Sequence, residues 1–310
     1  MGGIEFMSTF TSEKAVLPQE TATTTFTDRL AAAVELAKPR VLAMIVFTTL
    51  LTYLIAATDP LVPAHMLHTA LGVLFAAGGA LALNQHMEHH LDSKMARTLH
   101  RPIPSGRISP RAAFVLGMST MIFGYVYLWV AVNPGCSIAT MICGISYLYM
   151  YTPLKLRSSM STFVGAIPGG MLPIMGWFAA RDRLEIGAWI LFAILFLWQI
   201  PHALIISIRH QNDYRRVGMK QLPIISKPLT TNRQMILNIL ILIPITIMPY
   251  YVNMTEIIYP ITALVLGFAL FVFVVRFGMV RDSRSAKSVF LALNAYLPLL
   301  LLIMYLNKPS

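Results

Sequence analysis

The feature that most constrains this chain is a series of long apolar segments separated by short polar stretches. A transmembrane helix needs about 20 predominantly apolar residues, because it rises only about 1.5 Å per residue across the bilayer core. Nine segments reach this length or come near it, and they cover residues 41–57, 66–84, 112–132, 135–151, 161–180, 186–207, 235–252, 258–276 and 288–306. With 56% hydrophobic and 12% charged residues, the composition is not that of a soluble protein. We therefore expect an all-α fold, a polytopic membrane bundle of about nine transmembrane helices.

The polar stretches leave no room for a separate soluble domain. We expect residues 1–36 to form a flexible cytoplasmic N-terminal arm, in which residues 1–6 resemble a vector-derived leader. Residues 37–310 would then form a single membrane domain.

The basic residues are distributed unevenly along the chain. A net charge of +11 also fits a protein that binds nucleic acid, but 21 of the 24 Lys and Arg residues lie in the N-terminal arm and in every second loop. This distribution is typical of the cytoplasmic loops of a membrane protein and argues against a nucleic-acid partner. It predicts a cytoplasmic N-terminus and a C-terminus on the opposite side. Because the N-terminal arm lacks an Arg-rich presequence, we expect a bacterial inner membrane, with the mitochondrial inner membrane as the alternative.

Three oxygen-bearing side chains follow the second apolar segment at intervals of four residues. Asn84, Glu88 and Asp92 would lie on one face of a helix where it leaves the bilayer. Carboxylates near a membrane are costly and are candidates for function, and oxygen ligands of this kind suit Mg²⁺. Asp213, in the sixth loop, is a surface acid if it stands alone, or a ligand of a second Mg²⁺ if it joins the stripe.

Basic residues gather close to these oxygen ligands in the sequence. Each is either an ordinary anchor at the membrane surface or part of a clamp for a phosphate group, which Arg binds through two parallel hydrogen bonds. The candidates for such a clamp are Lys94, Arg97, Arg101, Lys155 and Arg157. A metal site and an anion site at the mouth of a membrane helix together indicate a diphosphate substrate with an apolar tail.

Histidines and aromatic residues supply the remaining candidates. His86 and His90 lie beside the stripe, and His202 follows Pro201 within the sixth apolar segment. A single His in a helical bundle usually does no more than form a hydrogen bond, and no spacing here matches a structural zinc site. Trp198 and Tyr151 lie near the same polar helix ends.

Five stretches of the sequence carry a resemblance to a known family. They are KPR at 38–40, NQHMEHHLDSKMARTLHRP at 84–102, YTPLK at 151–155, WQIPH at 198–202 and DYRRVGMKQLP at 213–223. Together they resemble the UbiA-type intramembrane prenyltransferases, and among these the branch that farnesylates heme. The resemblance covers about residues 36 to 306. Two departures are Glu88, where the family often has Asp, and Leu156, which separates Lys155 from Arg157.

The resemblance implies a reaction and a role for each candidate. A farnesyl group would pass from farnesyl diphosphate to a vinyl group of heme b (protoheme IX). Mg²⁺ would be held by Asn84, Glu88 and Asp92, and a second ion by Asp213. The basic residues would bind the diphosphate, and aromatic faces such as those of Tyr151 and Trp198 would stabilise the carbocation. His202, His86 and His90 would be the candidates for contact with heme. Heme A synthase and oxidase assembly factors would be downstream partners.

Two alternatives remain open from the sequence. One is a UbiA-type enzyme that acts on a quinone precursor, although those branches usually carry two aspartates four residues apart, whereas Arg209 here stands four residues before Asp213. The other is a secondary transporter, which would place its acidic residues near the middle of the bilayer rather than at one end.

Overall fold

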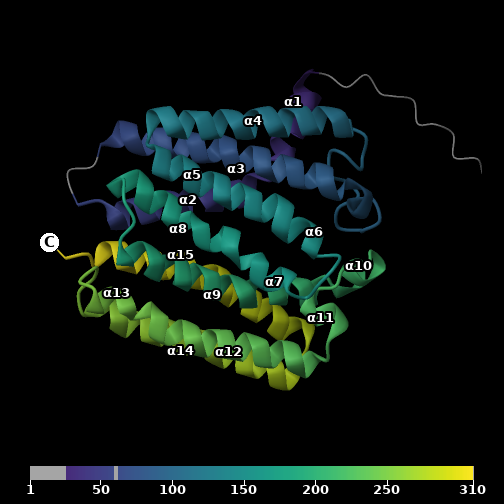
Figure 1. Cartoon of the computed structure of the whole chain (residues 1–310). Helices are drawn as coiled ribbons and strands as arrows, with labels where there is room; N and C mark the ends of the chain where they lie inside the picture. The colour runs from purple at the N-terminus through teal and green to yellow at the C-terminus, as the bar shows by residue number, and fades with distance from the viewer. Residues whose placement is uncertain (1–25, 59–61, 310) are drawn as a thin grey trace, which may run out of the picture.

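A computed structural model describes residues 26–58 and 62–309 of the chain, so residues 1–25 of the predicted arm, with the leader, lie outside the described residues. Every regular element in the described part is helical. Figure 1 shows these helices side by side in one bundle, with α10 and α11 at one end and the C-terminus at the other. We call the first of these the α10 end. The elements are α1 Phe26–Leu36, α2 Pro39–Ala56, α3 Pro63–Asp92, α4 Pro110–Ala131, α5 Pro134–Ile145, η1 Ser146–Tyr151, α6 Thr152–Leu154, α7 Ser161–Val164, α8 Ala166–Arg181, α9 Ile186–Arg209, α10 Gln211–Arg216, α11 Leu222–Ile225, α12 Pro228–Thr246, α13 Met248–Tyr251, α14 Ile258–Val280 and α15 Ser283–Leu306.

The prediction of an all-α membrane bundle is confirmed. Within the described ranges, eight helical segments are long and apolar enough to cross a membrane. Large apolar side chains on their outer faces, such as Val130 and Phe268, are exposed, as expected for contact with lipid. The predicted segment 135–151 is the exception, because α5 passes into the π-helix η1 before α6. A π-helical turn within a longer helix often marks a functional site, and η1 leads directly to Lys155.

The helix that carries the oxygen stripe, α3, is packed tightly against α4 through glycines. A Cβ atom added at Gly79 would lie 2.4 Å from the backbone nitrogen of Met121, and one added at Gly124 would lie 2.3 Å from that of Ala76. Such small residues allow membrane helices to approach closely. This contact fixes the position of α3 and therefore of its polar end.

The last part of the predicted arm is helical. Ala32 and Leu36 of α1 are fully buried, and Gln85 of α3 donates a hydrogen bond of 2.9 Å to the carbonyl oxygen of Leu36. Between α1 and α2, Lys38 adopts a left-handed backbone conformation with φ of 49°. This turn brings the Lys38 side chain onto the polar end of α3, where it contacts Asn84.

Candidate functional site

The predicted stripe lies on one buried face at the end of α3. Asn84, Glu88 and Asp92 are 1%, 7% and 1% exposed, and all three line one large cavity. Their four-residue spacing on a continuous helix explains the shared face. Burial of two carboxylates at this place requires partners of opposite charge.

A basic side chain from a different part of the chain contacts each member of the stripe. These are charge-assisted contacts in a site largely closed to water, so they are strong. The pairs are Lys38 Nζ with Asn84 Oδ1 at 2.8 Å, Lys155 Nζ with Glu88 Oε1 at 2.6 Å, and Arg101 Nη1 with Asp92 Oδ2 at 2.6 Å. Arg97 and Arg40 also line the cavity. The cations at this end therefore outnumber the two carboxylates.

The two lysines respond differently to this environment. Burial lowers the pKa of Lys155, but the adjacent Glu88 carboxylate, together with Tyr151 and Tyr147, raises it, and the net result is a pKa above its usual range. Burial and the nearby Arg101 guanidinium lower the pKa of Lys38 to about 7. Within the described part of the chain, the hydrogen-bond acceptor of Lys38 is the neutral Asn84 amide. The crowded positive charge around Lys38 favours the binding of an anion.

The oxygen atoms of the stripe fit a hard divalent cation. One oxygen of Asp92, Oδ1, is buried and has no hydrogen-bond partner, which is costly unless a ligand satisfies it. Asn84 and Glu88 add one amide and one carboxylate, the donors that Mg²⁺ prefers. Among residues 26–58 and 62–309, no group of three or more His, Cys, Asp or Glu side chains is arranged to hold a metal ion, so Asp213 does not complete such a group with Glu88 and Asp92.

The cavity extends from this polar end deep into the bundle. Its volume is about 720 Å³, and its lining is mostly apolar. Along α3 it extends from Asp92 to Val73, which corresponds to about 28 Å of helix. Small residues on this face of α3, among them Ala76 and Ala80, leave the space open. The cavity can therefore hold a polar head at the stripe and a long apolar tail below it.

One wall of the cavity is built from flat side chains of α9 and α15. The rings of Trp198 and His202 stack at 4.7 Å between centroids, and those of His202 and Phe290 stack at 6.0 Å. Trp198 Nε1 donates a hydrogen bond of 2.9 Å to the carbonyl oxygen of Leu293, which fixes the indole. His202 Nδ1 is buried without a partner. We call Trp198, His202 and Phe290 the aromatic wall.

The structure places some of the sequence-predicted residues in the cavity and others outside it. The predicted residues that line the cavity are Asn84, Glu88, Asp92, Arg97, Arg101, Tyr151, Lys155, Trp198 and His202. Those that do not line it are His86, His90, Lys94, Arg157 and Asp213. His86, for example, lies against Phe114 and contacts the carbonyl oxygen of Pro110 on the outer side of α3. The roles of this second group stay predictions.

Several residues of the site were not predicted from the sequence. Gln221 lines the cavity, and its Oε1 atom is buried without a partner. The backbone NH of Lys220 donates a hydrogen bond of 2.8 Å to the carbonyl oxygen of Lys155, so the segment before α11 closes over the end of α6. Lys38 and Phe290 are also new members of the site. Lys38 had a weak signal, because Lys38-Pro39-Arg40 before the first apolar segment is part of the family resemblance, whereas Phe290 had none.

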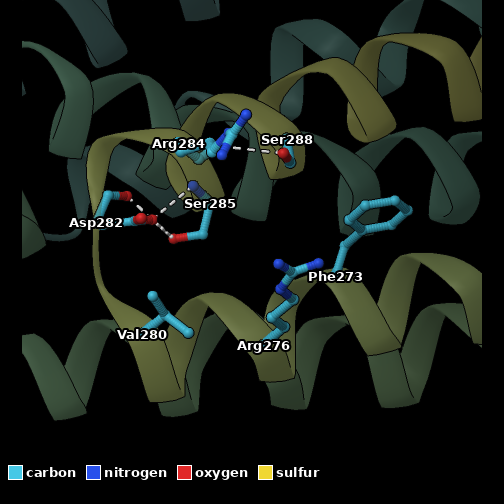
Figure 2. Close-up of a pocket in the computed structure, with 7 residues that line it drawn as sticks. All are labelled: Phe273, Arg276, Val280, Asp282, Arg284, Ser285 and Ser288. Atoms are coloured by element: carbon cyan, nitrogen blue, oxygen red, sulfur yellow. Dashed lines mark hydrogen bonds between the residues drawn. The ribbon is translucent and has the colours of Figure 1, made fainter.

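A second, smaller pocket lies between α14 and α15, and Figure 2 shows its residues. Its volume is about 220 Å³, and it shares no lining residue with the large cavity. The Asp282 carboxylate accepts a hydrogen bond from the Ser285 backbone and so caps α15. Arg276 and Arg284 lie beside it (Figure 2). The Asp282 carboxylate is therefore already used as the cap of α15. The large cavity holds the stripe, so we take it as the candidate site.

Comparison with known proteins bears on the family of the chain. The model of the UbiA prenyltransferase family matches residues 45–296. A protoheme IX farnesyltransferase of Solibacter usitatus (strain Ellin6076) is 37% identical over 290 residues, which cover 89% of this chain and 98% of that protein. A protoheme IX farnesyltransferase of Anaeromyxobacter sp. (strain Fw109-5) is 36% identical over 273 residues, which cover 88% of this chain and 92% of that protein.

Solved structures share the fold at lower identity. A digeranylgeranylglyceryl phosphate synthase matches with a TM-score of 0.77 at 17% identity, covering 90% of this chain and 98% of that one. A UbiA homologue from Archaeoglobus fulgidus bound to GPP and Mg²⁺ matches with a TM-score of 0.67 at 14% identity, covering 89% and 98%. These structures are helical membrane proteins of the same architecture.

Proposed function

This chain belongs to the UbiA prenyltransferase family, and on that basis we propose that it transfers a farnesyl group from farnesyl diphosphate to a vinyl group of protoheme IX. Relatives that match most of the chain carry the name protoheme IX farnesyltransferase. The product is heme O, the hydroxyethylfarnesyl derivative.

The observation that carries this proposal is the pairing of three oxygen ligands with three cations above one deep apolar cavity. Lys38 contacts Asn84, Arg101 contacts Asp92, and Lys155 contacts Glu88. A diphosphate brings negative charge for the cations, and its metal ion brings positive charge for the oxygens. The apolar lining below suits a farnesyl chain.

We assign Mg²⁺ to Asn84, Glu88 and Asp92. The buried, unpartnered Oδ1 atom of Asp92 supports this assignment, and a UbiA homologue from Archaeoglobus fulgidus has been solved with GPP and Mg²⁺. Asn84, Glu88 and Asp92 would hold the ion, and its positive charge would stabilise the leaving diphosphate. Asp213 would join a second ion only if α10 moved toward the cavity.

The cations of the site act on the diphosphate. Lys155, Arg101 and Arg97 line the cavity at the level of the stripe, so they neutralise the charge that grows as the allylic C–O bond breaks. Tyr151, over whose ring Lys155 lies at 4.6 Å, faces the same space. The aromatic faces of Tyr151 and Trp198 stabilise the allylic carbocation. The apolar cavity limits the access of water until the new bond has formed.

The aromatic wall binds the acceptor. Protoheme is a flat macrocycle, and stacked rings of Trp198, His202 and Phe290 offer a flat surface beside the tail cavity. The unpartnered Nδ1 atom of His202 is available for a contact with the acceptor or its iron. The vinyl carbon bonds to C1 of the farnesyl group, and water supplies the hydroxyl group and loses a proton.

We place the protein in a bacterial inner membrane, with the α10 end and the N-terminus in the cytoplasm. The clustering of Lys and Arg in the arm and alternate loops supports this orientation. Diphosphate would then leave into the cytoplasm. Heme A synthase and oxidase assembly factors are the proposed downstream partners.

The test is a reaction with purified protein in detergent. Protein, protoheme, farnesyl diphosphate and Mg²⁺ are incubated, and the pigments are analysed by mass. The proposal expects a product with the mass of heme O. Prenylation of an aromatic quinone precursor, with protoheme left unchanged, would assign the chain to another branch of the family.

A further inference from the structure

Beyond the cavity, the guanidinium group of Arg209 lies next to the aromatic wall. Arg209 at the end of α9 lies over the ring of Phe290, with its Cζ atom 4.4 Å from the ring centroid. Trp198, His202 and Arg209 are separated by four and seven residues, so they project from one face of α9. The four flat groups therefore form a row that runs from the interior of the bundle to the α10 end.

Among the described residues, the charge of Arg209 at the outer end of this row has no acidic partner. Arg209 is exposed, and no carboxylate lies within ion-pair distance of it among residues 26–58 and 62–309. Asp213, one turn further along the chain, does not pair with it. A guanidinium that is held by an aromatic face and lacks an acid is suited to bind a carboxylate of a ligand in a planar geometry.

The ligand of the wall, under the proposed function, has carboxylates on one edge only. Protoheme carries two propionates at one edge of the macrocycle, and its vinyl groups lie on the other half. Arg209 stands about 10 Å along α9 from His202, which is comparable to the width of the macrocycle. A propionate at Arg209 would leave the vinyl half directed into the cavity, beside the apolar tail.

We propose that Arg209 is the carboxylate-binding end of the acceptor site, and that it orients protoheme by pairing with a propionate. This inference rests on the proposed function. It makes Arg209 a positioning residue, since it contacts the edge of the substrate that does not react. We therefore expect the contribution of Arg209 to heme affinity to disappear when the propionates carry no charge.

The experiment is a heme titration followed by absorbance, with two ligands and four proteins. The ligands are protoheme and its dimethyl ester, in which both propionates are neutral. The proteins are the wild type, Arg209→Gln, Arg209→Lys and, as a matched control, Arg284→Gln. Arg284 is also an exposed arginine near the α10 end, but it lines the separate pocket of Figure 2.

The proposal expects Arg209→Gln to weaken protoheme binding roughly tenfold, as for the loss of one charge-assisted contact. The Arg209→Lys protein should lose less affinity for protoheme, and the Arg284→Gln protein should bind protoheme as tightly as the wild type. All four proteins should bind the dimethyl ester with similar affinity. An equal loss for both ligands would show a packing role and would overturn the proposal, as would unchanged protoheme binding in Arg209→Gln. If the wild type binds no protoheme and forms no heme O, it is instead the proposed function that fails.

Discussion

Lys155 Nζ lies 2.6 Å from Glu88 Oε1, and this buried ion pair joins α3 to the turn after α6, between residues 67 positions apart in the chain. Both side chains are about 10% exposed, so neither charge is well screened by water. The pair closes one side of the candidate metal and diphosphate site. Under the proposed function, Glu88 would exchange the Lys155 ammonium for a metal ion when the substrate binds.

The pairing predicts a loss of both stability and diphosphate binding when Lys155 is removed. Lys155→Ala leaves the Glu88 carboxylate buried without its partner, which costs about 3–5 kcal/mol, so the thermal midpoint in detergent should fall. The apparent KM for farnesyl diphosphate should rise and kcat should fall, by roughly ten- to a hundredfold together. The affinity for heme should stay nearly unchanged. A normal KM and kcat would remove Lys155 from the diphosphate site.

A double variant separates the two effects. Glu88→Gln with Lys155→Met replaces both charges by neutral groups of similar size, so it should regain most of the stability lost in Lys155→Ala. Turnover should nevertheless fall below that of Lys155→Ala, because a proposed metal ligand and a proposed diphosphate contact are both missing.

The aromatic wall predicts a variant that affects the acceptor alone. His202→Ala removes a ring that stacks on Trp198 and Phe290, so heme affinity should fall or the heme absorption spectrum should change. The apparent KM for farnesyl diphosphate should be unaffected. His68→Ala is a suitable control, because His68 contacts Tyr127 and does not line the cavity. Wild-type affinity and spectrum in His202→Ala would contradict the assignment, and His86 or His90 would be the next candidates.

Two adjacent glycines test the packing that positions the stripe. A Cβ at Gly79 would lie 2.4 Å from Met121 N in the backbone of α4, whereas a Cβ at Gly78 would meet its nearest neighbours at an ordinary 3.6 Å. Gly79→Ala should therefore push α3 from α4, at a cost of about 1–3 kcal/mol, and lower both the thermal midpoint and the turnover. Gly78→Ala should leave both quantities unchanged or slightly raised. Equal midpoints for the two variants would show that α3 and α4 can separate freely.

The orientation of the protein follows from the distribution of its basic residues. A reporter enzyme that is active only in the periplasm should work when fused at residue 310 and fail when fused at residue 105. The opposite pattern would place the stripe, and with it the diphosphate, outside the cytoplasm.

Much of the fold could be predicted from the sequence because helices that cross a bilayer require long apolar segments. The stripe was also predictable, since Asn84, Glu88 and Asp92 keep a four-residue spacing within one helix. Both conclusions depend on local patterns alone.

The partners of the stripe could not be predicted in the same way. Lys38 reaches Asn84 only through the left-handed turn before α2, and the two residues are 46 positions apart. Phe290 looks like one more lipid-facing residue of an apolar helix, and only its contacts with His202 and Arg209 place it in the site. Asp213 illustrates the opposite case, because a plausible acidic residue in a motif lies outside the cavity. Contacts between distant helices decide these points.

The central claim is that the stripe at the end of α3 holds Mg²⁺ for the transfer of farnesyl to heme. The most direct test is the amount of heme O that wild type and Asp92→Ala form from protoheme and farnesyl diphosphate, measured by mass with Mg²⁺ and with EDTA. Asp92 carries the unpartnered buried oxygen of the site. The account predicts heme O from the wild type with Mg²⁺ only, and almost none from a folded Asp92→Ala protein. Full activity in EDTA, or unchanged turnover in Asp92→Ala, would contradict it.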